Sequence, residues 1–306
     1  MTQKQLPSTD ILTTRNTFKS STIRKEVEVF IRHAQSGSIT TSKGRYHSVC
    51  CSWAGGHGKI YICYDTAKDR FLIEKRIDPV INHVAKNEIN LLKRINGSVG
   101  PKFIDSEGDS KIFMEIVDGE TIERIKPIGN FNTFRVFYQC AERLRRLNRL
   151  GVVHRDIKPE NIIDTENQVE LIDFGVSILD GREPFGRAII GTDGYISPEQ
   201  IEMKPVDSRA DVYCLGGVYY EILAKRRPFY AIDQAGYYNK HLNEIPADIY
   251  VLTEFEGLKR IALKCLEKDP DKRFEPSELV EAVAEEIRAI TKRFPILGLD
   301  FSKILA

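Results

Sequence analysis

Three polar side chains between Gly151 and Gly175 have the types and the order that phosphoryl transfer requires. Asp156, Asn161 and Asp173 lie at the ends of short apolar runs, which are typical of small buried strands with polar groups in the turns between them. Phosphoryl transfer needs a carboxylate beside the incoming hydroxyl and oxygen ligands that hold Mg²⁺ on a polyphosphate. This stretch therefore suits that chemistry, and the rest of the chain must position it.

The composition is that of an ordinary soluble globular protein. The chain has 306 residues, of which 42% are hydrophobic and 29% charged, and its formal net charge is +1. Such a balance gives no indication of binding to nucleic acid or to an anionic membrane. No apolar run reaches the ~18 residues of a membrane span. The six cysteines show no CxxC spacing, so we expect reduced thiols in a cytoplasmic protein.

The prevailing spacing of apolar residues changes near Asp118, from a period of two residues to one of 3.6. Before that point an alternating pattern predicts antiparallel strands and one helix, and after it a period of 3.6 predicts helices. Strands are expected over residues 48–53, 59–64, 70–77, 103–105 and 111–117, and helices over 82–95, 133–150, 207–224, 258–266 and 279–287.

Several short motifs together resemble those of a known family. His154-Arg155-Asp156 is followed by Asn161 and then by Asp173-Phe174-Gly175, and the segment from Gly191 to Glu199 reads GTDGYISPE. Over roughly residues 45–290 the chain resembles the eukaryotic-like (Hanks-type) serine/threonine protein kinases. Its motifs look more like those of bacterial members than those of animal members. The resemblance implies an α+β, two-lobed protein-kinase fold, with a small antiparallel β-sheet N-lobe (45–117) carrying one main helix and a larger α-helical C-lobe (118–290).

The same resemblance assigns roles to individual residues. Asp156 would orient the hydroxyl of a protein Ser or Thr, Lys158 would lie against the γ-phosphate of ATP, and Asn161 and Asp173 would hold Mg²⁺. Lys75 would pair with the phosphates and Glu88 would hold Lys75 in place. The remaining ATP-binding positions that it implies are Gly55, Gly56, Gly58, Ile60, Ile73, Met114, Glu115, Val117 and Ile163.

Two departures from the family pattern leave other functions open. Trp53 stands where the first glycine of the phosphate loop usually lies, and Ile73 stands where an alanine usually roofs the adenine pocket. Both would crowd a nucleotide, so one alternative is a pseudokinase scaffold that binds nucleotide or a partner without transferring phosphate. A second alternative is small-molecule phosphotransfer, which would not be expected to include the segment from Gly191 to Glu199.

The activation segment is unusual in its composition. Residues 178–191 contain no hydroxyl side chain, and Ser177 lies too close to Asp173 to serve as the usual switch. We therefore expect an enzyme that is active without activation-loop phosphorylation, with Asp180 or Glu183 pairing with Arg155 in place of a phosphate. Autophosphorylation would fall on the N-terminal tail. Two further expectations are a buried pair between Arg273 and Glu199 and contacts of Glu120 and Glu160 with substrate arginines.

Both ends of the chain extend beyond the matched region. Residues 1–44 are expected to form a flexible tail (1–21) and an amphipathic helix (22–35) that packs on the following domain or binds a partner. The apolar tail at 291–306 is expected to dock on the large lobe or to join a second chain as a homodimer. Expected partners are protein substrates, with no nucleic acid and no membrane span. Delivery of a bacterial protein into a host cell is an alternative to a cytoplasmic location.

Overall fold

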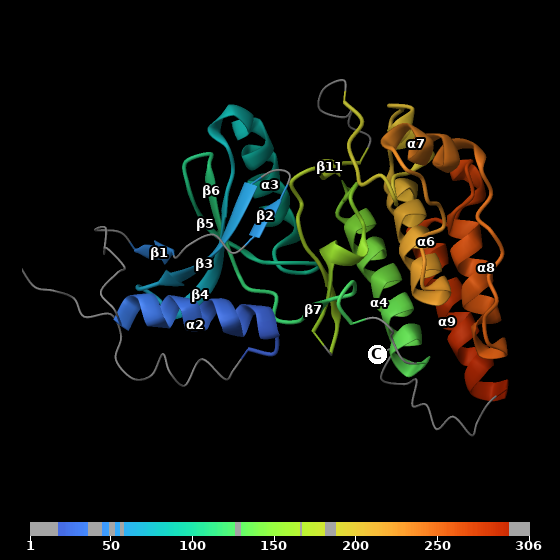
Figure 1. Ribbon diagram of the computed structural model, residues 1–306, viewed down its shortest axis with the longest axis horizontal. Helices are drawn as coiled ribbons and strands as arrows, with labels where there is room; N and C mark the ends of the chain where they lie inside the picture. Colours follow the sequence, from blue (N-terminus) through green and yellow to red (C-terminus); the bar gives the residue numbers. More distant parts are fainter. Residues whose placement is uncertain are drawn as a thin grey trace, which may run out of the picture. The chain divides into compact units, whose positions relative to one another are not determined.

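The computed structural model describes residues 18–35, 45–48, 53–55, 58–125, 130–165, 167–180 and 188–293. The chain divides into two compact units, Met1–Glu120 and Thr121–Ala306, called the first and second unit below. Strands dominate the first unit and helices dominate the second (Figure 1). This is the α+β composition that the resemblance implies. The predicted apolar tail lies almost wholly outside the described residues.

The first unit is built on a six-stranded antiparallel sheet. Its strand order is β1-β3-β4-β6-β5, and β2 pairs with the same strand, β3, as β1 does. The one strand expected over residues 48–53 is therefore two strands, separated by residues outside the described part of the chain. The strands are β1 (Tyr46–Ser48), β2 (Trp53–Gly55), β3 (Gly58–Asp65), β4 (Arg70–Arg76), β5 (Phe103–Glu107) and β6 (Lys111–Met114).

Helix α3 (Asn82–Ile95) follows a short 3₁₀ turn, Pro79–Ile81, and has the bounds that the sequence predicts. It ends because Asn96 adopts a left-handed conformation (φ 44°) and donates its N–H to the carbonyl of Leu92. Leu92 and Ile95 are buried on its inner face, and Glu88 lies one turn before Leu92 on the same side. The helix thus presents a carboxylate to the sheet.

Helix α2 (Ser21–Gln35) confirms the amphipathic helix that the N-terminal pattern predicts, and it packs on the sheet of its own unit. Its apolar residues Ile23, Val27, Phe30 and Ile31 join Ile62, Tyr64 and Phe71 of β3 and β4 in one buried cluster, the α2 cluster. Figure 1 shows the helix running beside these two strands. The flexible tail expected up to residue 21 is wrong for its last residues, since Ser20 is buried.

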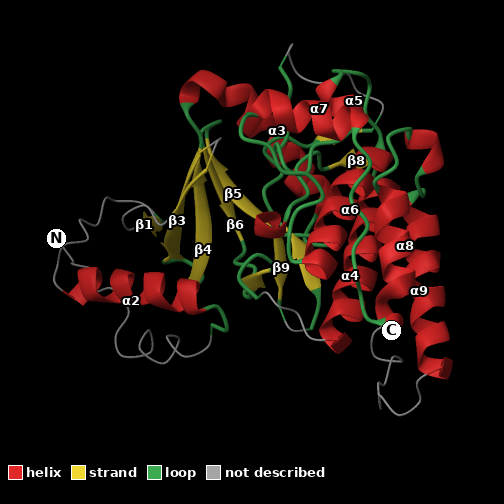
Figure 2. Cartoon of the chain, turned by 45° about the vertical axis from the view of Figure 1, so that its right-hand side comes forward, coloured by secondary structure: helices red, strands yellow, loops and turns green. Residues whose placement is uncertain are grey.

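The second unit is organised around α6 (Ser208–Ala224), which is buried on nearly every side. Asp207 begins it by accepting the N–H of Arg209. Helices α4, α8 and α9 pack along it (Figure 2). The other helices are α4 (Asn130–Arg149), α5 (Pro198–Ile201), α7 (Gln234–Asn243), α8 (Glu256–Cys265) and α9 (Pro276–Arg293), with 3₁₀ turns at Pro159–Asn161, Thr253–Phe255 and Pro270–Lys272.

Short strands complete the second unit. Strand β9 (Ile162–Asp164) pairs with β10 (Val169–Leu171) and with β7 (Glu120–Thr121), and β8 (Val152–Val153) pairs with β11 (Ile178–Leu179). The small buried strands predicted around Asp156 and Asp173 are thus present. In the described ranges no helix combines the length and the apolar character needed to cross a membrane.

Candidate active site

The short strands of the second unit bring the predicted polar residues together. Strands β8 and β9 flank the turn that carries Asp156, and β10 leads into Asp173. The N–H of Ile172 donates to the carbonyl of Asn161 over 3.0 Å. This bond continues the β9–β10 ladder by one step and brings Asp173 next to Asn161. Segments eleven residues apart in the sequence are thereby joined at their polar ends.

Asp156 lies at the centre of a small hydrogen-bond network. Its Oδ1 accepts the hydroxyl of Thr192 over 2.6 Å, and its Oδ2 lies 2.8 Å from the ammonium of Lys158 and accepts from the amide nitrogen of Asn161 over 3.0 Å. Lys158 also donates to the Thr192 hydroxyl, over 2.8 Å. These three side chains fix the Asp156 carboxylate, as a group that is to meet a substrate hydroxyl requires.

The backbone beneath Asp156 is strained and held by a buried carboxylate. Arg155 has φ 69°, a left-handed conformation that costs a non-glycine residue free energy. Asp211, at the start of α6, accepts the N–H of His154 over 2.7 Å and that of Arg155 over 2.8 Å. Burial raises the pKa of Asp211 to about 7, although the two N–H donors and Arg155 oppose the shift. The sequence places Asp211 only near the start of a helix, so this role escaped prediction.

His154 is a completely buried histidine in the same turn. Its Nε2 lies 3.1 Å from the carbonyl of Ile172, which can only accept, so Nε2 carries the proton. Nδ1 then accepts the N–H of Asp156 over 3.3 Å. Burial lowers the pKa of His154, which agrees with this neutral form. The ring also packs against Phe174, with centroids 4.9 Å apart.

Asn161 and Asp173 have the donor chemistry of a magnesium site. Because the Asn161 nitrogen donates to Asp156, its carbonyl oxygen is the atom that remains to bind a cation. Asp173 has φ 66° and contributes a carboxylate. Within the described ranges no group of three or more His, Cys, Asp and Glu side chains could enclose a metal ion alone. A cation here would need further oxygens from a polyphosphate, the usual situation for Mg²⁺.

In the first unit, Lys75 and Glu88 form a buried ion pair. The Lys75 ammonium lies 2.8 Å from both carboxylate oxygens of Glu88. Both side chains are almost fully buried, so removing either one would leave a charge without its partner. The predicted pairing of these two residues is thus present, and an ordinary surface glutamate at position 88 is excluded.

The other predicted nucleotide contacts of the first unit lie on or near the same sheet. Ile60 pairs with Lys75, and Ile73 with Met114. The N–H of Glu115 donates to the carbonyl of Lys102 over 2.9 Å, so Glu115 would meet an adenine through its carbonyl oxygen. A Cβ at Gly58 would lie 2.4 Å from the Arg76 carbonyl oxygen, so strand packing alone requires glycine there. Gly55 ends β2, Val117 is half-buried after β6, Gly56 lies outside the described residues, and Ile163 is buried in β9 of the second unit.

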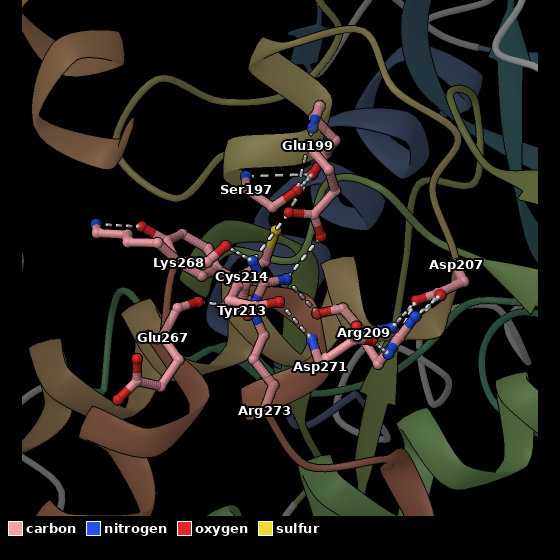
Figure 3. Close-up of polar contacts among 12 residues, drawn as sticks. Ser197, Glu199, Asp207, Arg209, Tyr213, Cys214, Glu267, Lys268, Asp271 and Arg273 are labelled. Atoms are coloured by element: carbon pink, nitrogen blue, oxygen red, sulfur yellow. Dashed lines mark hydrogen bonds and ion pairs between the residues drawn. The ribbon is translucent and has the colours of Figure 1, made fainter. Parts of the chain in front are cut away.

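The predicted pair between Arg273 and Glu199 anchors the end of the activation segment (Figure 3). The guanidinium nitrogens lie 2.6 and 2.9 Å from the two carboxylate oxygens, and the Arg273 side chain has no exposed surface. Arg273 also donates from Nε, Nη1 and Nη2 to the carbonyls of Glu267, Arg209 and Lys268, so all three guanidinium nitrogens have backbone partners. Removing one partner of such a pair typically costs ~3–5 kcal/mol.

One sequence-based expectation about acidic partners, the pairing of Arg155 with Asp180, is corrected. Arg155 makes no ion pair with Asp180 in the described part of the chain. Its guanidinium donates to the Val176 carbonyl over 3.3 Å, while Asp180 uses its N–H on Gly151. Glu183 lies outside the described residues. Glu120 accepts the N–H and the hydroxyl of Ser21 at the start of α2, and contacts of Glu120 and Glu160 with substrate arginines stay a prediction.

Comparison with known proteins agrees with this site. The model of the protein kinase domain matches residues 54–283. A probable serine/threonine-protein kinase of Streptomyces coelicolor is 30% identical over 262 residues, which cover 77% of this chain and 38% of the relative. The serine/threonine-protein kinase PknA of Corynebacterium glutamicum is 31% identical over 260 residues, 76% of this chain and 55% of the relative.

PknB of Mycobacterium tuberculosis, also a serine/threonine-protein kinase, is 35% identical over 184 residues, 56% of this chain and 29% of the relative. In these three comparisons the match spans between 29% and 55% of the relative's length. The family model, in contrast, covers most of the chain, including every site residue described above. The chain belongs to the protein kinase domain family.

Proposed function

We propose that the protein is a serine/threonine protein kinase that transfers the γ-phosphate of ATP to Ser or Thr hydroxyls of protein substrates. The observation that carries the proposal is the network of Asp156, Lys158 and Thr192. It joins a carboxylate suited to a hydroxyl proton, a cation suited to a phosphate and a residue of the activation segment. Relatives named as serine/threonine kinases support the choice of acceptor.

In this mechanism the substrate hydroxyl attacks the γ-phosphorus, and its proton passes to Asp156. An O–P bond forms to the acceptor, the bond from the γ-phosphorus to the β,γ-bridging oxygen breaks, and ADP leaves. Lys158 offsets negative charge on the transferred group, and Thr192 keeps the Asp156 carboxylate in place. Lys75, held by Glu88, would pair with the α- and β-phosphates. Bound Mg²⁺, held by Asn161 and Asp173, would neutralise charge on the β- and γ-phosphates.

Two finer points belong to the same proposal. The enzyme would work without phosphorylation of its activation segment, because residues 178–191 carry no hydroxyl and Ser177 is buried with its hydroxyl on the carbonyl of His154. It would phosphorylate itself on the Ser- and Thr-rich N-terminal segment. The second candidate function is a nucleotide-binding pseudokinase scaffold, favoured only by the bulk of Trp53 and Ile73.

A phosphate-transfer assay with a generic protein substrate separates the two. We expect transfer by the natural chain, and loss of most of it, ~10²-fold or more, in Asp156→Ala and in Asp173→Ala. Asp156→Ala should still bind ATP, because Asp156 acts on the hydroxyl. Asp271→Ala is the matched control, since this aspartate is largely exposed in the same unit. Equal turnover of the natural chain and Asp156→Ala would contradict the kinase mechanism, and absent turnover with retained ATP binding would favour the scaffold.

A further inference from the structure

The α2 cluster contacts Ile73, the residue of the sheet that the resemblance places over the adenine. On β3 and β4 the paired residues Tyr64 and Phe71 belong to the α2 cluster. Four residues further along β4, Lys75 forms an ion pair with Glu88 of α3. Ile73 lies between Phe71 and Lys75, two residues from each, so the three side chains are on the same face of β4. The structure places Ile73 and Ile116 in contact with the α2 cluster. The side chain that would roof the adenine therefore packs against the cluster to which α2 contributes four residues.

The start of α2 is held by two carboxylates that follow β6. Asp118 accepts the N–H groups of Lys19 and Ser20 over 2.8 and 3.0 Å. Glu120 accepts the N–H and the hydroxyl of Ser21 over 2.8 and 3.0 Å. The buried Ser20 hydroxyl then caps the helix by accepting the N–H of Ile23. N–H groups at a helix start are good donors to carboxylates, so these bonds tie the helix to the segment after β6.

The cluster itself is well packed. Phe71 meets the ring of Phe30 edge-on at 5.4 Å and that of Phe18 at 6.3 Å, and Tyr64 lies 6.0 Å from Phe30. Aromatic contacts of this kind hold side chains in fixed positions beyond what buried area alone provides. Packing on one side and carboxylate bonds at one end therefore both immobilise the helix against the sheet.

We propose that α2 is a built-in part of the nucleotide site, which sets the affinity for the adenine of ATP by fixing Ile73 and Ile116. This inference rests on the proposed function, since it is the kinase resemblance that places the adenine beside Ile73. Residues of α2 and the two carboxylates are positioning residues: they act through Ile73 and Ile116 and not on the phosphates. Loosening the helix should therefore weaken the binding of ATP but leave that of a bare polyphosphate unchanged.

A pair of substitutions at Ser21 tests the proposal. Ser21 is the first residue of α2, where proline fits the helix but lacks the N–H, so Ser21→Pro removes both bonds to Glu120 without breaking the helix. Ser21→Ala keeps the N–H and is the matched control. Calorimetry would measure the binding of Mg·ATP and of Mg·tripolyphosphate, and hydrogen exchange would follow the amides of α2. We expect Ser21→Pro to weaken ATP binding roughly tenfold, with faster exchange in α2, unchanged tripolyphosphate binding and near-natural behaviour of Ser21→Ala.

Adding Asp118→Ala to Ser21→Pro also removes the bonds that Lys19 and Ser20 donate to Asp118 and keeps the test decisive. If α2 exchanges faster in this double variant and ATP binds as tightly as before, the helix does not shape the site and the proposal fails. Tighter ATP binding would overturn it too, because α2 would then obstruct the adenine. Unaltered exchange in the double variant would show that the carboxylates do not hold the helix. If the natural chain bound neither ATP nor tripolyphosphate, the proposed function itself would be wrong.

Discussion

Thr192 is the residue through which the activation segment reaches the catalytic carboxylate. Its hydroxyl donates to Asp156 and accepts from Lys158, so one side chain bridges both groups. A phosphate on this oxygen would place a dianion against Asp156, and the hydroxyl must therefore act unmodified. This geometry agrees with the proposal that Thr192 acts through its free hydroxyl and that the activation segment works without phosphorylation.

We expect Thr192→Val, which keeps the shape but removes the hydroxyl, to lower the turnover number by roughly 10–10²-fold, because Asp156 loses one of its positioning bonds. Thr192→Ser is the matched control and should retain most of the activity. Initial rates at saturating ATP and peptide measure the effect. The KM for ATP should change little, since the Thr192 hydroxyl bonds to Asp156 and Lys158, which act on the substrate hydroxyl and the transferred phosphate in the proposed mechanism. A Thr192→Val enzyme as fast as the natural one would remove Thr192 from the mechanism.

Arg155 is a buried cation close to the carboxylate of Asp211. Its Nε has no hydrogen-bond partner among the described residues, and burial lowers the pKa of its guanidinium. The expected acid at Asp180 does not pair with it, yet the turn is already fixed by the bonds from Asp211. We therefore propose that these backbone bonds to Asp211 supply the ordering that a phosphate often supplies.

Treatment with phosphatase should consequently leave the initial rate nearly unchanged. The control is a mock-treated sample of the same protein, and mass spectrometry would verify that N-terminal phosphates have been removed. Rates must be read before the enzyme can phosphorylate itself again. A large loss of activity, together with the loss of a phosphate between residues 177 and 195, would show that the segment is switched after all.

The sequence allowed the residues with local signatures to be predicted, but not their distant partners. Asp156, Lys158 and Asn161 lie within six residues of one another, so the resemblance of one short motif to the kinase family assigns all three. Asp211 binds backbone groups more than fifty residues away, and Asp118 and Glu120 bind the start of α2 almost a hundred residues before them. Such bonds depend on the packing of whole elements. A single sequence carries no periodic signal for them.

At the scale of elements, the clearest predictions were the helices with a strong apolar stripe. The bounds of α3 and α6 agree closely with the pattern, whereas α7 was missed because its ten residues, QAGYYNKHLN, are short, contain a glycine and have no clear stripe. Helix α9, Pro276–Arg293, is also longer than the predicted stretch 279–287, and Ile290 is buried beyond the predicted end. Packing and capping, which the apolar pattern does not record, decide these ends.

Two adjacent glycines in α6 show how closely that helix packs. A Cβ at Gly216 would lie 2.6 Å from the Cβ of Cys265 in α8, while one at Gly217 would lie 3.2 Å from the ring of Tyr195. In a helix, alanine is more favourable than glycine by about 1 kcal/mol. Replacing a helical glycine with alanine should therefore destabilise the protein only if the added Cβ clashes. Gly216→Ala should therefore lower the free energy of unfolding by ~1–3 kcal/mol.

Gly217→Ala is the matched control and should be close to neutral, because the Tyr195 ring needs to shift by only a few tenths of an ångström. Urea unfolding followed by circular dichroism measures both variants. If the two alanines had equal effects, the contact between α6 and α8 would be looser than the structure indicates.

At the scale of the whole molecule, two completely buried histidines make stability depend on pH. His241, at the end of α7, accepts the hydroxyl of Tyr213 on Nδ1 over 3.0 Å, and the Lys268 ammonium donates to the same hydroxyl over 3.2 Å. Burial first, and then the charge of Lys268, lower the pKa of His241 to about 3. Burial also lowers the pKa of His154. Both histidines are thus neutral in the folded protein.

A folded-state pKa below that of the unfolded chain, ~6.5 for histidine, means that the unfolded state binds more protons between the two values. The stability that neutral His241 contributes is therefore complete above pH 6.5 and is lost as the pH falls toward 3. Between pH 7 and pH 5 the loss should be about 2 kcal/mol for His241 alone. His241→Gln, whose side chain can still accept from Tyr213, should be less stable at pH 7 but should lose about 2 kcal/mol less over this interval. His83→Gln, on the exposed surface of α3, is the control. Urea unfolding at both pH values gives the comparison, and an equal pH dependence in the natural chain and His241→Gln would show that His241 takes up a proton while the protein remains folded.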